Sequence, residues 1–168
     1  MTDNYIQLNK DSVLRLQILD ANKKPTGEHL EFDLEDTELL LRYQNLLEED
    51  KKLRSKLKNE LYLIEKRQDV KGKKFLSKNE EDSLRTINEF FKNETKVLNM
   101  FLGENGVEKL LNGRKFSWFT LKEIDEIVTK QIAPYIDKAM DDLTTKIKEV
   151  YGKPLDKKEE IEVIEWNQ

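Results

Sequence analysis

The sequence lacks cysteine and contains one histidine in 168 residues. Without cysteine there can be no disulfide, no thiolate ligand for zinc and no thiol nucleophile, and one histidine excludes a histidine-rich metal centre. No apolar run approaches the roughly 20 residues that cross a bilayer. Residues 1–10 show no basic segment followed by an apolar one, so we expect neither a signal peptide nor a membrane span.

Motifs of catalytic and nucleotide-binding sites are also missing. No HExxH, EF-hand loop, G-x-S-x-G or GxxxxGK[ST] occurs. Neighbouring carboxylates such as Asp141 and Asp142 point in different directions on a helix, which suits solvent better than a shared proton or a metal ion. His29 falls on the polar side of its predicted strand and is expected to be a solvated surface residue. We therefore expect no catalytic residue, no cofactor and no metal site.

The sequence is unusually rich in charged residues. Charged residues make up 38% of the chain, against about 25% in ordinary globular domains, which favours long solvated helices. Residues 1–50 carry 12 acidic and 5 basic side chains, whereas residues 51–75 carry 3 acidic and 10 basic ones. The basic segment 51–75 could bind nucleic acid or an acidic partner, or it could be a solvated face. We favour the solvated face, because the chain is acidic overall and only Tyr62 and Phe75 are aromatic there.

Near the N-terminus, two segments alternate apolar and polar side chains with the period of a β-strand. The apolar positions are Leu14, Leu16, Ile18, Leu30, Phe32 and Leu34. Between the segments lie residues 22–27, where Pro25 restricts one backbone dihedral and Gly27 can supply a positive φ. We predict a β-hairpin over residues 13–34. A lone hairpin is marginally stable, so its apolar face should cover a helix or join a neighbouring subunit.

Two long helices are predicted next. The chain contains no Gly or Pro from Asp33 to Asp69, and its apolar side chains recur at helical spacing, with Asp33 or Asp36 as the N-cap. Ser77-Lys-Asn-Glu80 has the pattern of a capping box, which predicts a second helix that Gly103 can end. We expect these helices to form an antiparallel hairpin across a turn at Gly72.

The remaining elements are shorter. Glycines at 103, 106 and 113 surround a predicted helix over Val107–Leu111, with Asn105 as its cap. Thr120-Leu-Lys-Glu123 has the pattern of another capping box, which predicts a final helix that ends near Tyr151. Pro134 lies inside this helix and predicts a kink near residues 130–133.

Together these predictions give an α+β fold that is mostly α. It consists of an N-terminal β-hairpin followed by a long-helix hairpin, a short helix and a kinked C-terminal helix. We expect a single helical domain over residues 1–152 and a charged C-terminal tail over residues 153–168.

Two segments resemble the tail assembly chaperones of long-tailed bacteriophages and related prophages of Gram-positive hosts. The opening strands of that family are similar to Leu14-Arg-Leu-Gln-Ile-Leu-Asp20 followed by Glu31-Phe-Asp-Leu34. The turn and short helix of the family are similar to Met100-Phe-Leu-Gly-Glu-Asn-Gly-Val-Glu-Lys-Leu-Leu111. The basic segment 51–75 has no counterpart in the family pattern.

The resemblance implies a non-enzymatic assembly factor in the host cytoplasm. Such a factor binds the long tape measure protein, keeps it soluble, helps recruit tail tube protein and associates with itself. We expect the apolar hairpin face and the region from Leu102 to Phe119 to supply the protein contacts. The candidate protein-binding residues are Leu14, Leu16, Ile18, Leu30, Phe32, Leu102, Leu110, Phe116, Trp118 and Phe119.

Two alternatives remain open at this point. The chain could be a nucleic-acid-binding or regulatory helical protein that uses the basic segment 51–75, although nucleic acid is not the expected partner. It could also be a structural component of the virion, such as a tail or connector protein. A membrane is not an expected partner.

Overall fold

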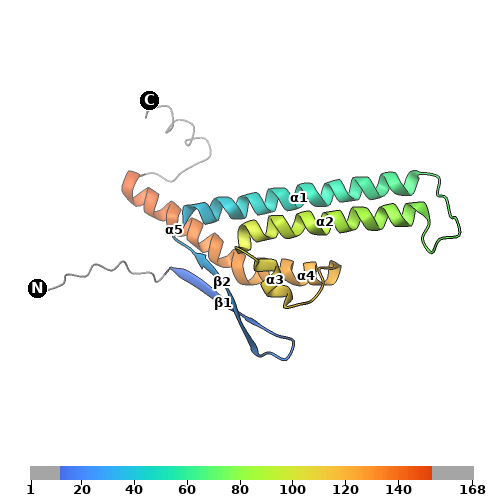
Figure 1. The fold of residues 1–168 in the computed structure, drawn as a ribbon. Coiled ribbons are helices and arrows are strands. Elements are labelled where there is room, and N and C mark those ends of the chain that lie inside the picture. The colour runs from blue at the N-terminus through green and yellow to red at the C-terminus, as the bar shows by residue number, and fades with distance from the viewer. Residues whose placement is uncertain (1–11, 153–168) are drawn as a thin grey trace, which may run out of the picture. The chain divides into compact units, whose positions relative to one another are not determined.

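The computed structural model describes residues 12–152. Its elements in chain order are β1 (Val13–Leu19), β2 (Pro25–Asp33), α1 (Thr37–Lys66), α2 (Lys78–Leu102), α3 (Gly106–Leu111), α4 (Trp118–Ile127), the π-helical turn η1 (Val128–Ile132) and α5 (Ala133–Tyr151) (Figure 1). The predicted α+β, mostly α fold is confirmed. The predicted C-terminal tail, residues 153–168, lies outside the described residues.

The chain divides into two compact units with the boundary between Ile124 and Asp125, inside α4. The first unit contains the β-hairpin, α1, α2, α3 and the start of α4. The second contains the end of α4, η1 and α5. The candidate site lies within the first unit.

β1 and β2 pair antiparallel, with Leu14 opposite Phe32 and Leu16 opposite Leu30. This register places alternate apolar side chains on one face, as the sequence predicts. The second strand begins at Pro25, five residues before the predicted start at Leu30. The predicted turn over residues 22–27 was therefore wrong. Gly27, with φ +86°, lies inside β2 where the pairing register is irregular, so its positive φ serves a bulge.

The connection between the strands is built on Asp20 instead. Its Oδ1 accepts hydrogen bonds from the backbone N–H of Asn22 at 2.8 Å and of Lys24 at 2.9 Å. This local side-chain to backbone bonding is what favours Asp in tight turns. Lys23 adopts the left-handed region there, with φ +61°.

α1 and α2 form the predicted antiparallel helical hairpin and lie side by side along their length (Figure 1). Asp36 caps α1, because its Oδ1 accepts a hydrogen bond from the Glu38 backbone N–H at 2.9 Å. α1 ends at Lys66, three residues before the predicted end. At its start, α2 has the predicted capping box, in which Ser77 and Glu80 each bond the other's backbone N–H.

The predicted starts of α3 and α4 needed correction. Asn105 precedes α3 in the left-handed region, but its side chain makes no capping hydrogen bond. α4 begins at Trp118, before the predicted capping box at Thr120-Leu-Lys-Glu123. Ser117 and Thr120 instead bond each other's backbone N–H, at 3.3 Å and 2.8 Å, which is the reciprocal arrangement that starts a helix.

The predicted break near Pro134 is confirmed in the second unit. The backbone there winds as a π-helical turn over Val128–Ile132, and Pro134 occupies the first turn of α5. Proline has no backbone N–H and crowds the preceding turn, so the widened turn accommodates it at a helix start.

Candidate protein-binding surface

The two segments that carry the sequence resemblance meet in the first unit. The Phe32 ring of β2 stacks on the Phe101 ring of α2, with centroids 5.5 Å apart. The Tyr43 ring of α1 lies 5.4 Å from the same Phe101 ring. Phe32 and Phe101 are each only 3% exposed, and α3 also contacts β2. The β-hairpin therefore covers the end of the helical hairpin, as a marginally stable hairpin must.

Asn99 of α2 organises the glycine-containing turn before α3. Its side-chain Oδ1 accepts a hydrogen bond from the Val107 backbone N–H at 2.8 Å, and its Nδ2 donates to the Glu108 carboxylate at 3.0 Å. Gly106 is necessary at this turn, because a Cβ there would lie 2.5 Å from the Leu102 Cβ. The first turn of α3 is therefore capped from α2 and packs tightly against it.

An aromatic cluster joins the middle of α2 to the start of α4. The Trp118 ring lies 5.5 Å from the Phe90 ring and 5.0 Å from the Phe91 ring, and Phe116 packs edge-on to Phe91 at 5.2 Å. Trp118 nevertheless remains 47% exposed. One side of the indole is thus held by phenylalanine rings while another side faces solvent.

The candidate protein-binding residues separate into three groups by exposure. Buried side chains are Ile18, Leu30, Phe32 and Leu102. Partly exposed ones are Leu14, Leu16, Leu110 and Phe116. Exposed ones are Trp118 and Phe119, and Phe119 is 83% exposed. The buried group forms part of the protein's own core, so direct partner contact through these side chains does not fit this structure. The exposed pair at the start of α4 remains available, and we call it the α4 aromatic pair.

Other exposed apolar side chains were not among the candidates. Met100, 62% exposed, lies off the apolar stripe of α2. Leu41 is 62% exposed in α1, and Phe75, in the connection between α1 and α2, is 94% exposed. The sequence signal that could have identified them as exposed is a position off the helical period for Met100 and Leu41, and a position in a loop for Phe75. Periodicity identifies the side chains that pack and does not rank the ones that remain outside.

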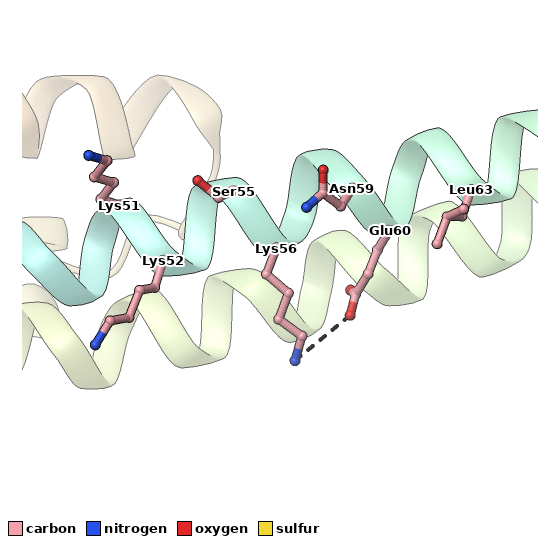
Figure 2. A pocket seen from close by; sticks show the side chains of 7 residues that line it. All are labelled: Lys51, Lys52, Ser55, Lys56, Asn59, Glu60 and Leu63. Carbon is pink, nitrogen blue, oxygen red and sulfur yellow. Dashed lines mark ion pairs between the residues drawn. The ribbon is translucent and has the colours of Figure 1, made fainter.

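A shallow hollow of about 500 Å³ runs along the outer face of α1 (Figure 2). It is lined by Lys51, Lys52, Ser55, Lys56, Asn59, Glu60 and Leu63. All of these residues belong to one helix, so no second element closes the hollow around a small ligand. Its Lys56 ammonium lies 3.8 Å from the Glu60 carboxylate. The hollow is therefore an ordinary solvated helix face.

Several other cations of the basic segment 51–75 are also paired within the protein. Lys52 lies 2.7 Å from Glu49, Arg54 lies 2.6 Å from Asp50, and Arg67 of the α1–α2 connection lies 2.9 Å from Asp82 of α2. These pairs support the interpretation of α1 as a charged, solvated helix. Among residues 12–152, the lysines at 71, 73 and 74 of the connection belong to the part of the basic segment for which no ion pair forms.

Residues 12–152 contain no cluster of three or more His, Asp or Glu side chains that could hold a metal ion. None of the described helices has the length and apolar character needed to cross a bilayer. The chain matches no family model, no curated protein and no solved structure. The functional assignment therefore depends on the residues themselves.

Proposed function

We propose that this chain is a non-enzymatic tail assembly chaperone of a long-tailed bacteriophage. It acts in the host cytoplasm, binds the tape measure protein, keeps that protein soluble and helps recruit tail tube subunits. The proposal starts from the resemblance of the hairpin strands and of the Met100–Leu111 segment to that family. The stack of Phe32 on Phe101 supports it, because it joins those two segments into one folded body.

The observation that carries the proposal is the α4 aromatic pair. Trp118 is held against Phe90 and Phe91, so it is presented to solvent in a set orientation rather than on a free loop. Phe119 follows it and is 83% exposed. Large rigid aromatic side chains are the residues most enriched at the centres of protein interfaces.

A tape measure protein fits this surface as a partner. It is a very long helix with apolar stripes, and such a stripe offers repeated sites to a small protein supplied in many copies. Each contact can be weak, because several copies on one polymer raise the overall avidity. The charged outer face of α1 would then face solvent and keep the complex in solution.

The proposal can be tested by coexpressing this chain with the very long helical protein encoded beside it. The wild-type chain should raise the soluble fraction of that protein and co-purify with it. Phe119→Ser should reduce both effects, because it removes an exposed aromatic side chain that no core contact requires. Val150→Ser, at a position that is 74% exposed in α5, is the matched control and should leave both effects unchanged. A tape measure protein that stays equally insoluble with and without the chain would contradict the proposal.

The two alternatives are separated by different measurements. A nucleic-acid-binding protein that uses segment 51–75 predicts a salt-dependent mobility shift with single- or double-stranded nucleic acid. A structural virion component predicts that the chain is present in purified particles, whereas a chaperone is absent from them. Mass spectrometry of purified particles therefore distinguishes a virion component from a chaperone.

A further inference from the structure

The connection between α1 and α2, residues 67–77, is held at its base by several polar contacts. Asp82 of α2 lies 2.9 Å from the Arg67 guanidinium and 3.0 Å from the Lys78 ammonium. Asn79 donates its backbone N–H to the Asp69 carboxylate at 3.0 Å and its side-chain amide to the Arg67 carbonyl at 3.1 Å. Lys78 also donates its backbone N–H to the Val70 carbonyl at 3.0 Å. The base is thus anchored, and the residues beyond it form the end of the helical hairpin (Figure 1).

These outer residues, 70–75, have an unusual composition, and we call them the basic tip. Lys71, Lys73 and Lys74 are exposed, and within the part of the chain that the structure describes none of them forms an ion pair. Val70 is 68% exposed and Phe75 is 94% exposed. An exposed aromatic side chain flanked by cations on an anchored loop suits an apolar contact with an acidic partner.

The opposite end of α1 carries the complementary charge. Residues 28–38 contain six acidic side chains and no Lys or Arg. Glu31 pairs with Arg15, and Asp36 caps α1 and lies 3.4 Å from Arg42. Neither Glu35 nor Glu38 has an ion pair among residues 12–152. We call residues 28–38 the acidic start.

The two charged regions cannot neutralise each other within one molecule. α1 spans 30 residues, which corresponds to about 45 Å at ~1.5 Å per residue. Electrostatic attraction between exposed charges is screened beyond roughly 8–10 Å at physiological salt. Favourable contact between the basic tip and the acidic start therefore requires two molecules.

We propose that the basic tip of one copy docks on the acidic start of a second copy. Leu41, 62% exposed and one helical turn beyond Glu38, provides an apolar side chain for Phe75 to contact. Because the contact joins two different surfaces, copies that meet end to end leave one tip and one acidic start free at each pair, and such copies associate head to tail. A helix also stabilises itself with acids at its start and bases at its end, but that effect ends within the terminal turns. It does not account for Lys71–Lys74 or for Phe75, which lie beyond α1.

This inference deepens the proposed function: head-to-tail association would help copies of the chain coat a long polymer, and that role rests on the proposed function. The association itself can be tested with the purified chain alone. Sedimentation velocity should show concentration-dependent association of the wild type at about 50 mM salt and weaker association at about 500 mM. The tip variant Lys71→Glu, Lys73→Glu, Lys74→Glu and the start variant Glu35→Lys, Glu38→Lys should each lose association by about tenfold or more. Phe75→Ser should weaken association without changing the charge.

Mixing the two charge-reversed variants is the decisive measurement. The start variant keeps the basic tip and the tip variant keeps the acidic start, so an equimolar mixture should associate through this one intact contact although neither variant associates alone. Lys92→Glu with Lys96→Glu, two exposed positions of α2, is the control and should behave as wild type.

Monomeric wild type at low salt, or a mixture in which association does not return, would overturn the inference. A wild type that stays monomeric yet binds single-stranded nucleic acid through the tip would also overturn it. All of these results are independent of whether a tape measure protein is bound.

Discussion

Phe32 of β2 stacks on Phe101 of α2 with ring centroids 5.5 Å apart, across 69 positions of sequence. Tyr43 of α1 packs on the same Phe101 ring. One phenylalanine thus connects the β-hairpin to both long helices, and it is the contact on which the position of the hairpin depends.

Replacing Phe101 with alanine should therefore destabilise the protein strongly. The side chain is 3% exposed, and truncation of a buried phenylalanine costs about 3–5 kcal/mol in the free energy of unfolding. Chemical denaturation followed by circular dichroism measures this difference. Tyr151→Ala, at a side chain that is 76% exposed at the end of α5, is the control and should change the free energy by no more than about 0.5 kcal/mol. Equal effects of the two variants would show that Phe101 is not a core residue.

Gly106 is expected to tolerate no side chain. An alanine Cβ there would lie 2.5 Å from the Leu102 Cβ, so α3 or α2 has to shift. Gly106→Ala should lower the free energy of unfolding by about 1–3 kcal/mol, as overpacking does. Gly72→Ala is the matched control, because a Cβ at Gly72 meets no atom within 4 Å. A thermal unfolding midpoint for Gly106→Ala equal to that of the control would contradict the close contact.

The contribution of Asn99 to the turn before α3 can be tested by a substitution that adds a negative charge but keeps a side-chain oxygen as hydrogen-bond acceptor. In the wild type the Asn99 amide donates to the Glu108 carboxylate at 3.0 Å. Asn99→Asp can still accept a hydrogen bond from the Val107 N–H, but it places a second carboxylate beside Glu108. We expect a loss of about 1–2 kcal/mol in unfolding free energy at neutral pH. The double variant Asn99→Asp with Glu108→Gln restores a donor and should recover most of the loss. Absence of recovery would mean that the Asn99–Glu108 contact does not stabilise the turn.

The base of the α1–α2 connection should open in acid. Hydrogen bonds and attraction from Lys78 and then Arg67 lower the pKa of Asp82 below its usual 3.8, and the Ser77 hydroxyl and the Asn79 N–H lower the pKa of Asp69. A carboxylate whose pKa is lower in the folded state adds stability that is complete above its unfolded pKa. That stability is lost as the pH falls through the lower folded pKa.

Carboxyl NMR titration measures this directly and should give midpoints below 3.8 for Asp82 and Asp69. Protection of the Asn79 amide against hydrogen exchange should decrease over the same acid range. In Asp82→Asn the Asn79 amide should exchange faster already at neutral pH. A midpoint at or above 3.8 would contradict the ion pairs at the base of the connection.

The local elements of this fold could largely be predicted from the sequence. The Asp36 cap, the Ser77–Glu80 capping box and the interruption before Pro134 depend on atoms within a few positions of each other. Their outcome therefore changes little with the rest of the chain. The start of α4 was missed because Ser117 and Thr120 offer overlapping capping patterns, and the packing of Trp118 on Phe90 and Phe91 favours the earlier one.

The candidate surface could be predicted only in part. Strand alternation places Leu30 and Phe32 on one apolar face, but it does not say whether that face meets the protein's own helices or a partner. Phe101 decides this, from a distant part of the chain. The same is true of Phe116 and Phe119, which look alike in sequence although one packs against Phe91 and the other is 83% exposed.

By itself, the sequence determined which helices and strands form and in what order, where α2 is capped, and that opposite charges collect at the two ends of α1. These properties follow from residue type and from spacing along the chain. Only the tertiary structure decided which apolar side chains are used up in the core and which remain exposed. Burial depends on contacts between distant segments, such as that of Phe32 with Phe101. The strand period of one segment and the helical period of the other each describe local spacing, so neither predicts that the two side chains meet.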